Sequence, residues 1–123
     1  EEAMQMVLNK EAIFAADDSD TITMDVPEWG GSIRLRPMTG QQRAEWEFWA
    51  TKRADKNGDS DFRGIRERLI IACVVDDDGE PLFDAGDLEE LSQKNALVLD
   101  RISDKCQEIS GMKTDSVEDA AKN

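Results

Sequence analysis

Alternating oxygen-bearing side chains between residues 55 and 61 form the one local pattern in this chain that suggests metal chemistry. Positions 1, 3, 5 and 7 of the segment DKNGDSD (55–61) are Asp, Asn, Asp and Asp, as in loops that bind Ca²⁺ through alternate residues. Such a loop has glycine at position 6 and a bidentate carboxylate at position 12, but Ser60 and Arg66 stand there. The sequence therefore favours a solvated loop between helices and predicts no metal site, with a calcium-responsive module as an alternative.

No side chain is accompanied by the partners that catalysis requires. The chain contains no histidine, so the usual general base and the usual pH switch near neutrality are missing. No glycine-rich phosphate loop follows a predicted strand. The two cysteines, Cys73 and Cys106, are predicted to be buried free thiols, with a disulfide as the alternative. Burial of Cys73 in the most apolar stretch should raise its pKa and make it inert. We predict a non-enzymatic protein with no catalytic residue and no cofactor.

Aromatic and arginine side chains are the candidate partner-binding groups. Trp46, Phe48 and Trp49 lie within four residues, and tryptophan is enriched at the energetic centres of protein interfaces. The alternative is that these rings cover the core. Arg34 and Arg36 share one face of a predicted strand, where they could meet an acidic partner or face solvent.

The charge balance excludes several partners. The 123 residues include 28 acidic and 15 basic side chains, a formal charge of −13. DNA carries about one negative charge per 1.7 Å of axis, so direct nucleic-acid binding is not expected, and anionic membrane surfaces are disfavoured for the same reason. No apolar run approaches the roughly 18 residues of a membrane-spanning helix.

Periodicity predicts an α+β fold that is predominantly α-helical. Two alternating runs in residues 21–36 surround Gly30-Gly31 and predict one N-terminal β-hairpin. A hairpin alone is marginal in water, so it should pack on about four to five helices. The first is expected from a capping box of Thr39 and Gln42 to about residue 54, and the second over 62–75. A short helix capped by Asp84 or Asp87 has Leu88 and Leu91 as its core positions, and the last helix runs over about 94–110 with Gly111 as its terminator. Apolar residues at spacings of three and four form a stripe on the second and on the last of these helices. A short helix or an arm is expected within 1–16. Residues 1–111 should form a single domain, followed by a loose C-terminal tail at 112–123.

Three segments occur in an order that resembles the small tail assembly chaperones of long-tailed (siphophage) bacteriophages. They are VPEWGGSIRLRPMTGQQRAEWE (26–47), LIIACVVDDDGEPLF (69–83) and DLEELSQKNALVLDRISDKCQEISG (87–111). The resemblance rests on a strand pair ending in Arg-x-Arg, a Thr-Gly helix start, an acidic turn after an apolar helix, and two closing helices. It covers most of the chain.

The resemblance implies an assembly factor that binds the tape-measure protein and tail-tube subunits in the host cell cytoplasm. It also implies absence from the mature virion, possible self-association, and in many such phages a frameshifted C-terminal extension. Ala121-Lys122-Asn123 can be encoded by a slippery heptamer, which permits such an extension. A small anionic partner can cover apolar stripes on another chain while keeping the complex soluble. The alternative from a different class is an acidic DNA-mimic or regulatory binding protein.

Overall fold

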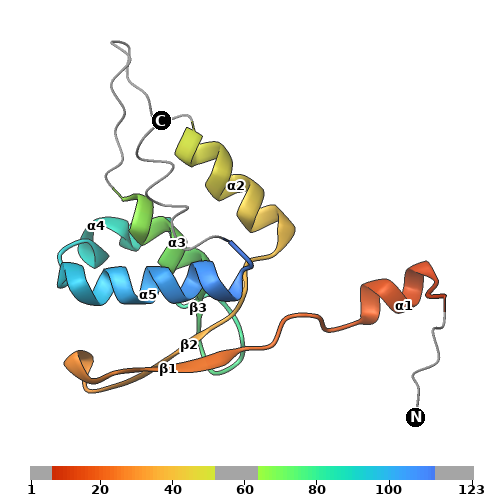
Figure 1. The fold of residues 1–123 in the computed structure, drawn as a ribbon, viewed down its shortest axis with the longest axis horizontal. Helices are drawn as coiled ribbons and strands as arrows, with labels where there is room; N and C mark the ends of the chain where they lie inside the picture. The colour runs from red at the N-terminus through yellow and green to blue at the C-terminus, as the bar shows by residue number, and fades with distance from the viewer. Residues whose placement is uncertain (1–6, 52–63, 113–123) are drawn as a thin grey trace.

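Helices dominate the computed structural model, which describes residues 7–51 and 64–112 (Figure 1). The predicted α+β, predominantly helical class is confirmed. The acidic loop at 55–61, the expected helix residues 52–54 and 62–63, and the tail after Met112 lie outside the described residues. The elements within them are α1 (Lys10–Ala15), β1 (Ile22–Val26), η1 (Pro27–Trp29), β2 (Gly31–Leu35), α2 (Gly40–Thr51), α3 (Ile65–Cys73), β3 (Val74–Val75), η2 (Ala85–Asp87), α4 (Leu88–Leu91) and α5 (Ala96–Ile109).

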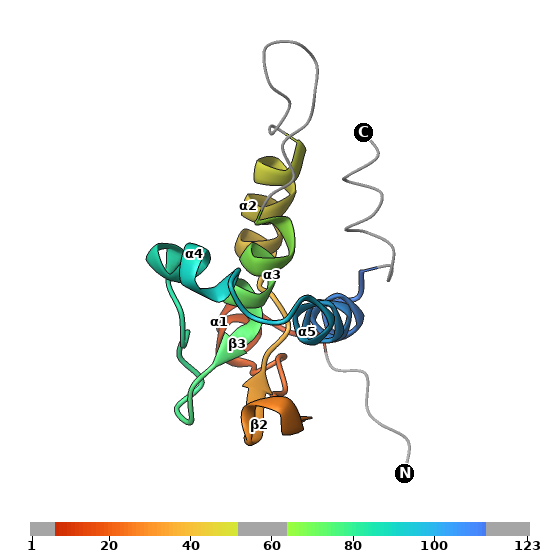
Figure 2. The same ribbon diagram turned by 90° about the vertical axis from the view of Figure 1, so that its left-hand side faces the viewer.

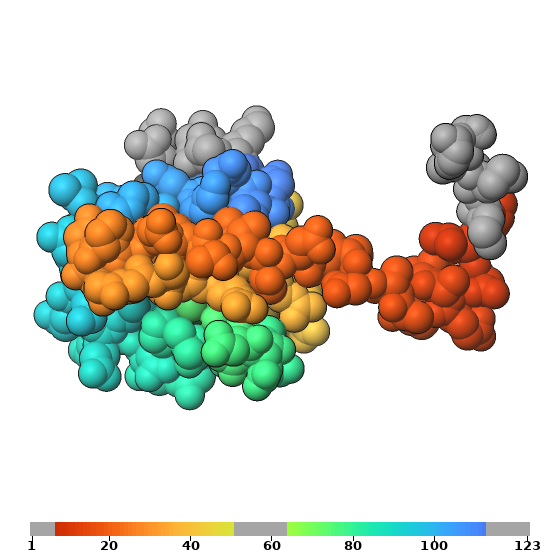
Figure 3. All heavy atoms as spheres, turned by 90° about the horizontal axis from the view of Figure 1, so that it is seen from below, coloured from red at the N-terminus to blue at the C-terminus, as the bar shows by residue number. Residues whose placement is uncertain are grey.

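The predicted hairpin is confirmed. β1 and β2 pair antiparallel, with Ile22 opposite Leu35 and Val26 opposite Gly31. The turn consists of the 3₁₀ segment η1 and Gly30, whose φ of 81° is readily adopted only by glycine. Alternation directs Val26 and Leu35 inward, where both are fully buried. Figure 3 shows the hairpin lying across one face of the helical body.

The sheet has a third strand, in a segment for which the sequence predicts a helix. The helix expected over 62–75 ends at Cys73, and Val74–Val75 pairs with β2 so that Val74 lies opposite Leu35. β-branched side chains lose rotamer freedom in a helix and fit a pleated surface. The free edge of β2 supplies the hydrogen-bond partners. The expectation of a helix through residue 75 is therefore wrong for these two valines.

The core lies where α3 and α5 pack against each other over the sheet. In Figure 2, α5 is seen end-on beside the upright α3, and β3 continues downward from the end of α3. The apolar stripes predicted for the two helices point into this contact, which confirms their helical periodicity. The fully buried side chains include Leu69, Ile70, Cys73, Val98, Leu99, Ile102 and Cys106.

The cysteines are both buried and free, as predicted. Their thiols form a hydrogen bond with each other, which lowers the pKa of Cys73. The same bond, together with burial, raises the pKa of Cys106 well above its ordinary value. Burial acts on the pKa of Cys73 in the predicted direction and raises it, but the hydrogen bonds with Cys106 and Ser110 outweigh burial, so the net pKa is lowered.

Both ends of helix α5 are capped by hydrogen bonds from residues close by in the sequence. Asn95 accepts hydrogen bonds from the amides of Leu97 and Val98 at 2.9 and 3.3 Å. At the other end Gly111, the predicted terminator, has a φ of 74°, and Met112 N donates to the Gln107 carbonyl at 2.8 Å in the pattern of a Schellman motif. Met112 is buried, so this first residue of the expected tail belongs to the core.

Removal of the α5 cap should destabilise the whole fold. Asn95→Ala is expected to lower the free energy of unfolding by about 1 kcal/mol, because two amide donors lose their acceptor. Urea denaturation followed by circular dichroism measures the change. Asn9→Ala is the matched control: Asn9 caps α1 by the same kind of bond, but α1 buries no residue, so this change should leave the midpoint unmoved.

A bidentate ion pair joins the hairpin turn to α5. Arg101 donates to the two Glu28 carboxylate oxygens at 2.6 and 3.0 Å. These bonds lower the pKa of Glu28 from 4.5 to about 2. A lowered pKa means that the stabilisation is present above about pH 4.5 and is lost as the pH falls toward 2.

Glu28→Gln should therefore make the free energy of unfolding less dependent on pH in the acid range. Wild type and variant are expected to differ at pH 7 and to converge as the pH approaches 2, because protonation removes the same charge from the wild type. Urea midpoints at several pH values test this. A constant difference between the two proteins down to pH 2 would contradict the pairing.

The N-terminal arm, residues 7–20, stands away from the body. Figures 1 and 3 show α1 beyond the end of β1, joined to the body by an extended segment. The expected short helix or arm is thus a helix carried on an arm. Every residue of α1 is exposed, so this element contributes nothing to the core.

Candidate functional site

Helix α2 begins with the predicted capping box, which fixes where its aromatic residues point. Gln42 N donates to the Thr39 hydroxyl at 3.1 Å, and Thr39 N donates to the Gln42 side chain at 2.9 Å. Trp46 and Trp49 then share the side that faces α3, since residues three apart lie on one helix face. Trp46 is 7% exposed, and its Nε1 donates to the Ile65 carbonyl at 3.2 Å. The indole thus joins α2 to α3.

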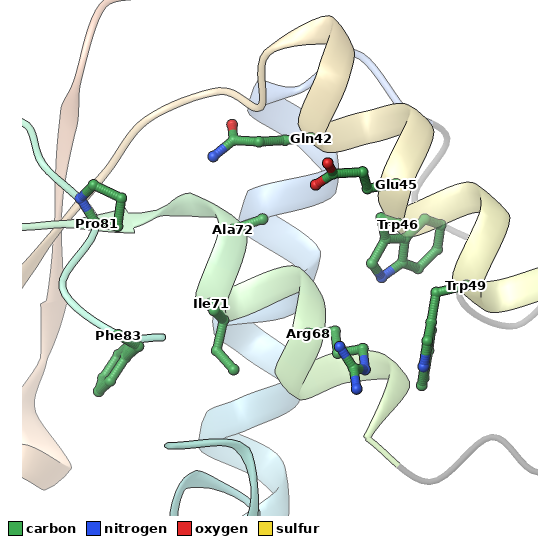
Figure 4. Close-up of a pocket in the computed structure, with 9 residues that line it drawn as sticks. All are labelled: Gln42, Glu45, Trp46, Trp49, Arg68, Ile71, Ala72, Pro81 and Phe83. Atoms are coloured by element: carbon green, nitrogen blue, oxygen red, sulfur yellow. The ribbon is translucent and has the colours of Figure 1, made fainter. Parts of the chain in front are cut away.

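A hollow of about 280 Å³ lies between α2, α3 and the segment 81–83 (Figure 4). Pockets for drug-sized molecules occupy roughly 300–1,000 Å³, so this space suits a few anchoring side chains better than a small molecule. The Arg68 guanidinium lies over the Trp49 ring, 4.7 Å from its centroid, a stacking that stabilises both groups. The hollow is lined by Gln42, Glu45, Trp46, Trp49, Arg68, Ile71, Ala72, Pro81 and Phe83.

A second hollow of about 110 Å³ extends this space toward β2. It shares Gln42, Ala72 and Pro81 with the first, and Arg36 and Glu80 are among its other lining residues. We call the two together the α2–α3 groove. Arg36 Nη1 donates to the Gly79 carbonyl at 3.3 Å. Within residues 7–51 and 64–112, the buried Nε atoms of Arg36 and Arg68 have no hydrogen-bond partner. The lining of the groove combines these two basic side chains with the acidic side chains of Glu45 and Glu80.

The five predicted partner-binding residues therefore separate into two groups. Trp46, Trp49 and Arg36 lie along the groove. Phe48 is 65% exposed and is not among the groove's lining residues. Arg34 lies 3.8 Å from Asp77, near the polar turn after β3. Whether any of the five binds a partner stays a prediction.

Sequence reasoning missed most of the groove's lining, including Arg68, Ile71 and Phe83. Arg68 and Ile71 are three apart on α3 and so share a helix face, which was the available signal. Phe83 has no such local signal, because the chain returns to the groove only after the turn at 76–80. In that turn Asp76 accepts from the amides of Asp78 and Glu80 at 2.8 and 3.0 Å.

Other kinds of site have no counterpart in the part of the chain that the structure describes. There, no group of three or more His, Cys, Asp or Glu side chains is arranged to hold a metal ion. No helix among the same residues combines the length and apolarity needed to cross a bilayer. The groove is thus the main candidate site, and its lining suits apolar recognition beside a few charged side chains of both signs.

Comparisons with known proteins agree with this picture. No curated protein sequence matches the chain. Among solved structures, it is similar to the structure of the bacteriophage HK97 tail assembly chaperone, with a TM-score of 0.57 and 20% identity over 80% of this chain and 90% of that chain. At this identity the likeness establishes the fold alone. The family model for phage tail assembly chaperones matches residues 4–123. The chain therefore belongs to the phage tail assembly chaperone family.

Proposed function

We propose that this chain is a non-enzymatic chaperone that binds the tape-measure protein and tail-tube subunits in the cytoplasm of the infected host. It acts during tail assembly and is absent from the mature virion. The observation that carries the proposal is the α2–α3 groove, which combines apolar side chains with Arg36 and Arg68 on a protein of charge −13. Membership of the family supports the role in tail assembly.

The groove suits an amphipathic helix. Such a helix docks by placing apolar side chains, spaced three and four residues apart, into a hydrophobic groove. A tape-measure protein is expected to be long and largely helical, with apolar stripes uncovered until the tube encloses them. Acidic residues beside such a stripe would pair with Arg36 and Arg68. The surplus negative charge of the chaperone keeps the complexes apart in solution.

Co-expression tests the proposal. The tape-measure protein of the same phage is expected to be largely insoluble alone and soluble when this chain is co-expressed. The complex should survive about 0.5 M salt, because apolar burial is insensitive to screening whereas exposed ionic contacts are not. Affinity capture with the tail-tube protein tests the second partner.

Two further results would speak against the proposal. Mass spectrometry of purified phage particles should detect no stoichiometric amount of the chain, and its presence there would make it a structural component. Binding to a basic nucleic-acid-binding protein, competed by DNA and lost steeply with salt, would favour the DNA-mimic alternative.

A further inference from the structure

The two buried cysteines stand where the end of α3 meets the last turns of α5. Cys73 is the final residue of α3, Cys106 lies near the end of α5, and neither side chain is exposed to solvent. Both thiols are free and belong to the core that the two helices form over the sheet (Figure 2). The cysteines are thus a pair contributed by two separate elements.

Helix geometry turns the Cys106 thiol toward Cys73. The Ser110 hydroxyl lies 3.9 Å from Cys73 Sγ, so this face of α5 is directed at the end of α3. Cys106 is four residues before Ser110, and residues four apart share one helix face. The hydrogen bond between the two thiols agrees with this placement. The two sulfur atoms therefore face each other across the contact between the helices.

Backbone hydrogen bonds hold both partners of the pair in place. The Cys73 carbonyl accepts from Arg36 N at 2.9 Å, and the strand that follows, β3, pairs with β2. On the other helix, Ser110 Oγ accepts from Met38 N at 3.1 Å. The ends of α3 and α5 are thereby tied to the same short stretch of chain, residues 36–38, which keeps the two thiols next to each other.

The two thiols differ in reactivity. The hydrogen bond with Cys106, assisted by that with Ser110, lowers the pKa of Cys73 against the effect of burial. The bond with Cys73 and burial both raise the pKa of Cys106. Because the thiolate is the nucleophile, Cys73 is the residue that reacts first. A cysteine of low pKa beside a second, resolving cysteine is the arrangement found in redox-sensing proteins.

The Cys73 sulfur lies one side chain below the surface. Ser110, whose hydroxyl touches it, is half-buried, and the neighbouring Gly111 is exposed. Helix ends open more readily than helix centres, so a small neutral oxidant can reach the sulfur when the end of α5 opens. A bulky thiol reagent requires a much larger opening.

We propose that Cys73 and Cys106 are a redox-sensitive pair that hydrogen peroxide converts into a disulfide linking α3 to α5. The Cys73 sulfur attacks one peroxide oxygen, the O–O bond breaks, and the departing hydroxide takes up the Cys73 proton, which leaves a sulfenic acid and one water. The Cys106 sulfur then attacks the sulfenic sulfur, the S–O bond breaks, and the Cys106 proton leaves with the hydroxide as a second water. Both thiols are oxidised and one peroxide is reduced. The proposal is independent of tape-measure binding.

The disulfide should strengthen the fold. It closes the loop from residue 73 to residue 106, which contains β3 and α4, and so restricts the unfolded chain. For a loop of this length, the folding equilibrium constant is expected to rise about a hundredfold. Urea denaturation of the oxidised chain, with and without a reductant, measures the change.

Peroxide treatment of the full-length chain tests the chemistry. The denatured product should contain no thiol that iodoacetamide can alkylate until a reductant is added, and a protease digest without reductant should contain one fragment that joins residues 73 and 106. Cys106→Ser should stop at the sulfenic acid, which dimedone traps. Cys73→Ser is the matched control and should react at least about tenfold more slowly, because burial still raises the pKa of Cys106.

Three results would overturn the proposal. Two alkylatable thiols after peroxide has already oxidised the methionines would mean that the cysteines only fill the core. Disulfide-linked dimers in place of the internal fragment would mean that the sulfur atoms do not meet within one chain. An oxidised form that unfolds at lower urea than the reduced form would mean that the bond strains the helix contact. If either serine variant loses its circular dichroism spectrum, the thiol count and the digest of the wild type still decide the outcome.

Discussion

Trp46→Ala is expected to lower the free energy of unfolding by about 3–5 kcal/mol, the cost typical of removing a large buried aromatic side chain. Trp46 is 7% exposed and packs in the core cluster, and its indole N–H donates to the Ile65 carbonyl at 3.2 Å. Removal of the Trp46 side chain leaves a cavity between α2 and α3 and removes the hydrogen bond between these two helices. Domains of this size have only about 5–15 kcal/mol of stability, so the variant should sit close to its unfolding transition.

Two companion variants separate the contributions. Trp46→Phe retains a ring but loses the N–H donor and some volume, so it should cost less than Trp46→Ala. Phe48→Ala removes a neighbouring aromatic ring that is 65% exposed and should change stability by about 0.5 kcal/mol or less. Urea denaturation followed by tryptophan fluorescence measures all three. A stable Trp46→Ala that fails to bind a tail protein would instead assign Trp46 to an interface.

Local periodicity was sufficient to predict the parts of the fold whose signals repeat along the chain. The apolar stripe of Leu99, Ile102 and Cys106 was predictable because apolar residues recur there at spacings of three and four, once per helical turn. The capping box at Thr39 and the terminator Gly111 were readable because capping depends on a few neighbouring residues. These are local interactions, and the structure contains them as predicted.

Pairing between distant segments could not be predicted in the same way. Val74 and Val75 continue the apolar pattern of the preceding helix, and a two-residue strand has no period of its own. Their strand conformation depends on the edge of β2, about forty residues earlier. The groove has the same origin: Trp49 could be singled out by residue type, but its neighbours Ile71 and Phe83 come from separate segments. Phe14 of α1 is 79% exposed. Its exposure could not be predicted from neighbouring residues either, because it depends on which residues the rest of the fold covers.

Trp49→Ala is expected to weaken capture of the tape-measure protein about 30-fold, an effect of about 2 kcal/mol that is typical of an interface hot spot. Trp49 forms a wall of the groove, and its ring supports the Arg68 guanidinium at 4.7 Å. The substitution therefore removes an apolar contact surface and frees the arginine to take other rotamers. Trp49 is only half-buried, so the loss of stability should be much smaller than that for Trp46→Ala.

Titration of the tape-measure segment that co-purifies with the wild-type chain measures this effect. Leu97→Ala is the matched control, since it truncates an exposed apolar side chain on α5 that does not line the groove, and its affinity should equal that of the wild type. Phe48→Ala shows whether the contact extends around α2. If Trp49→Ala binds as tightly as Leu97→Ala, the α2–α3 groove is not the client site.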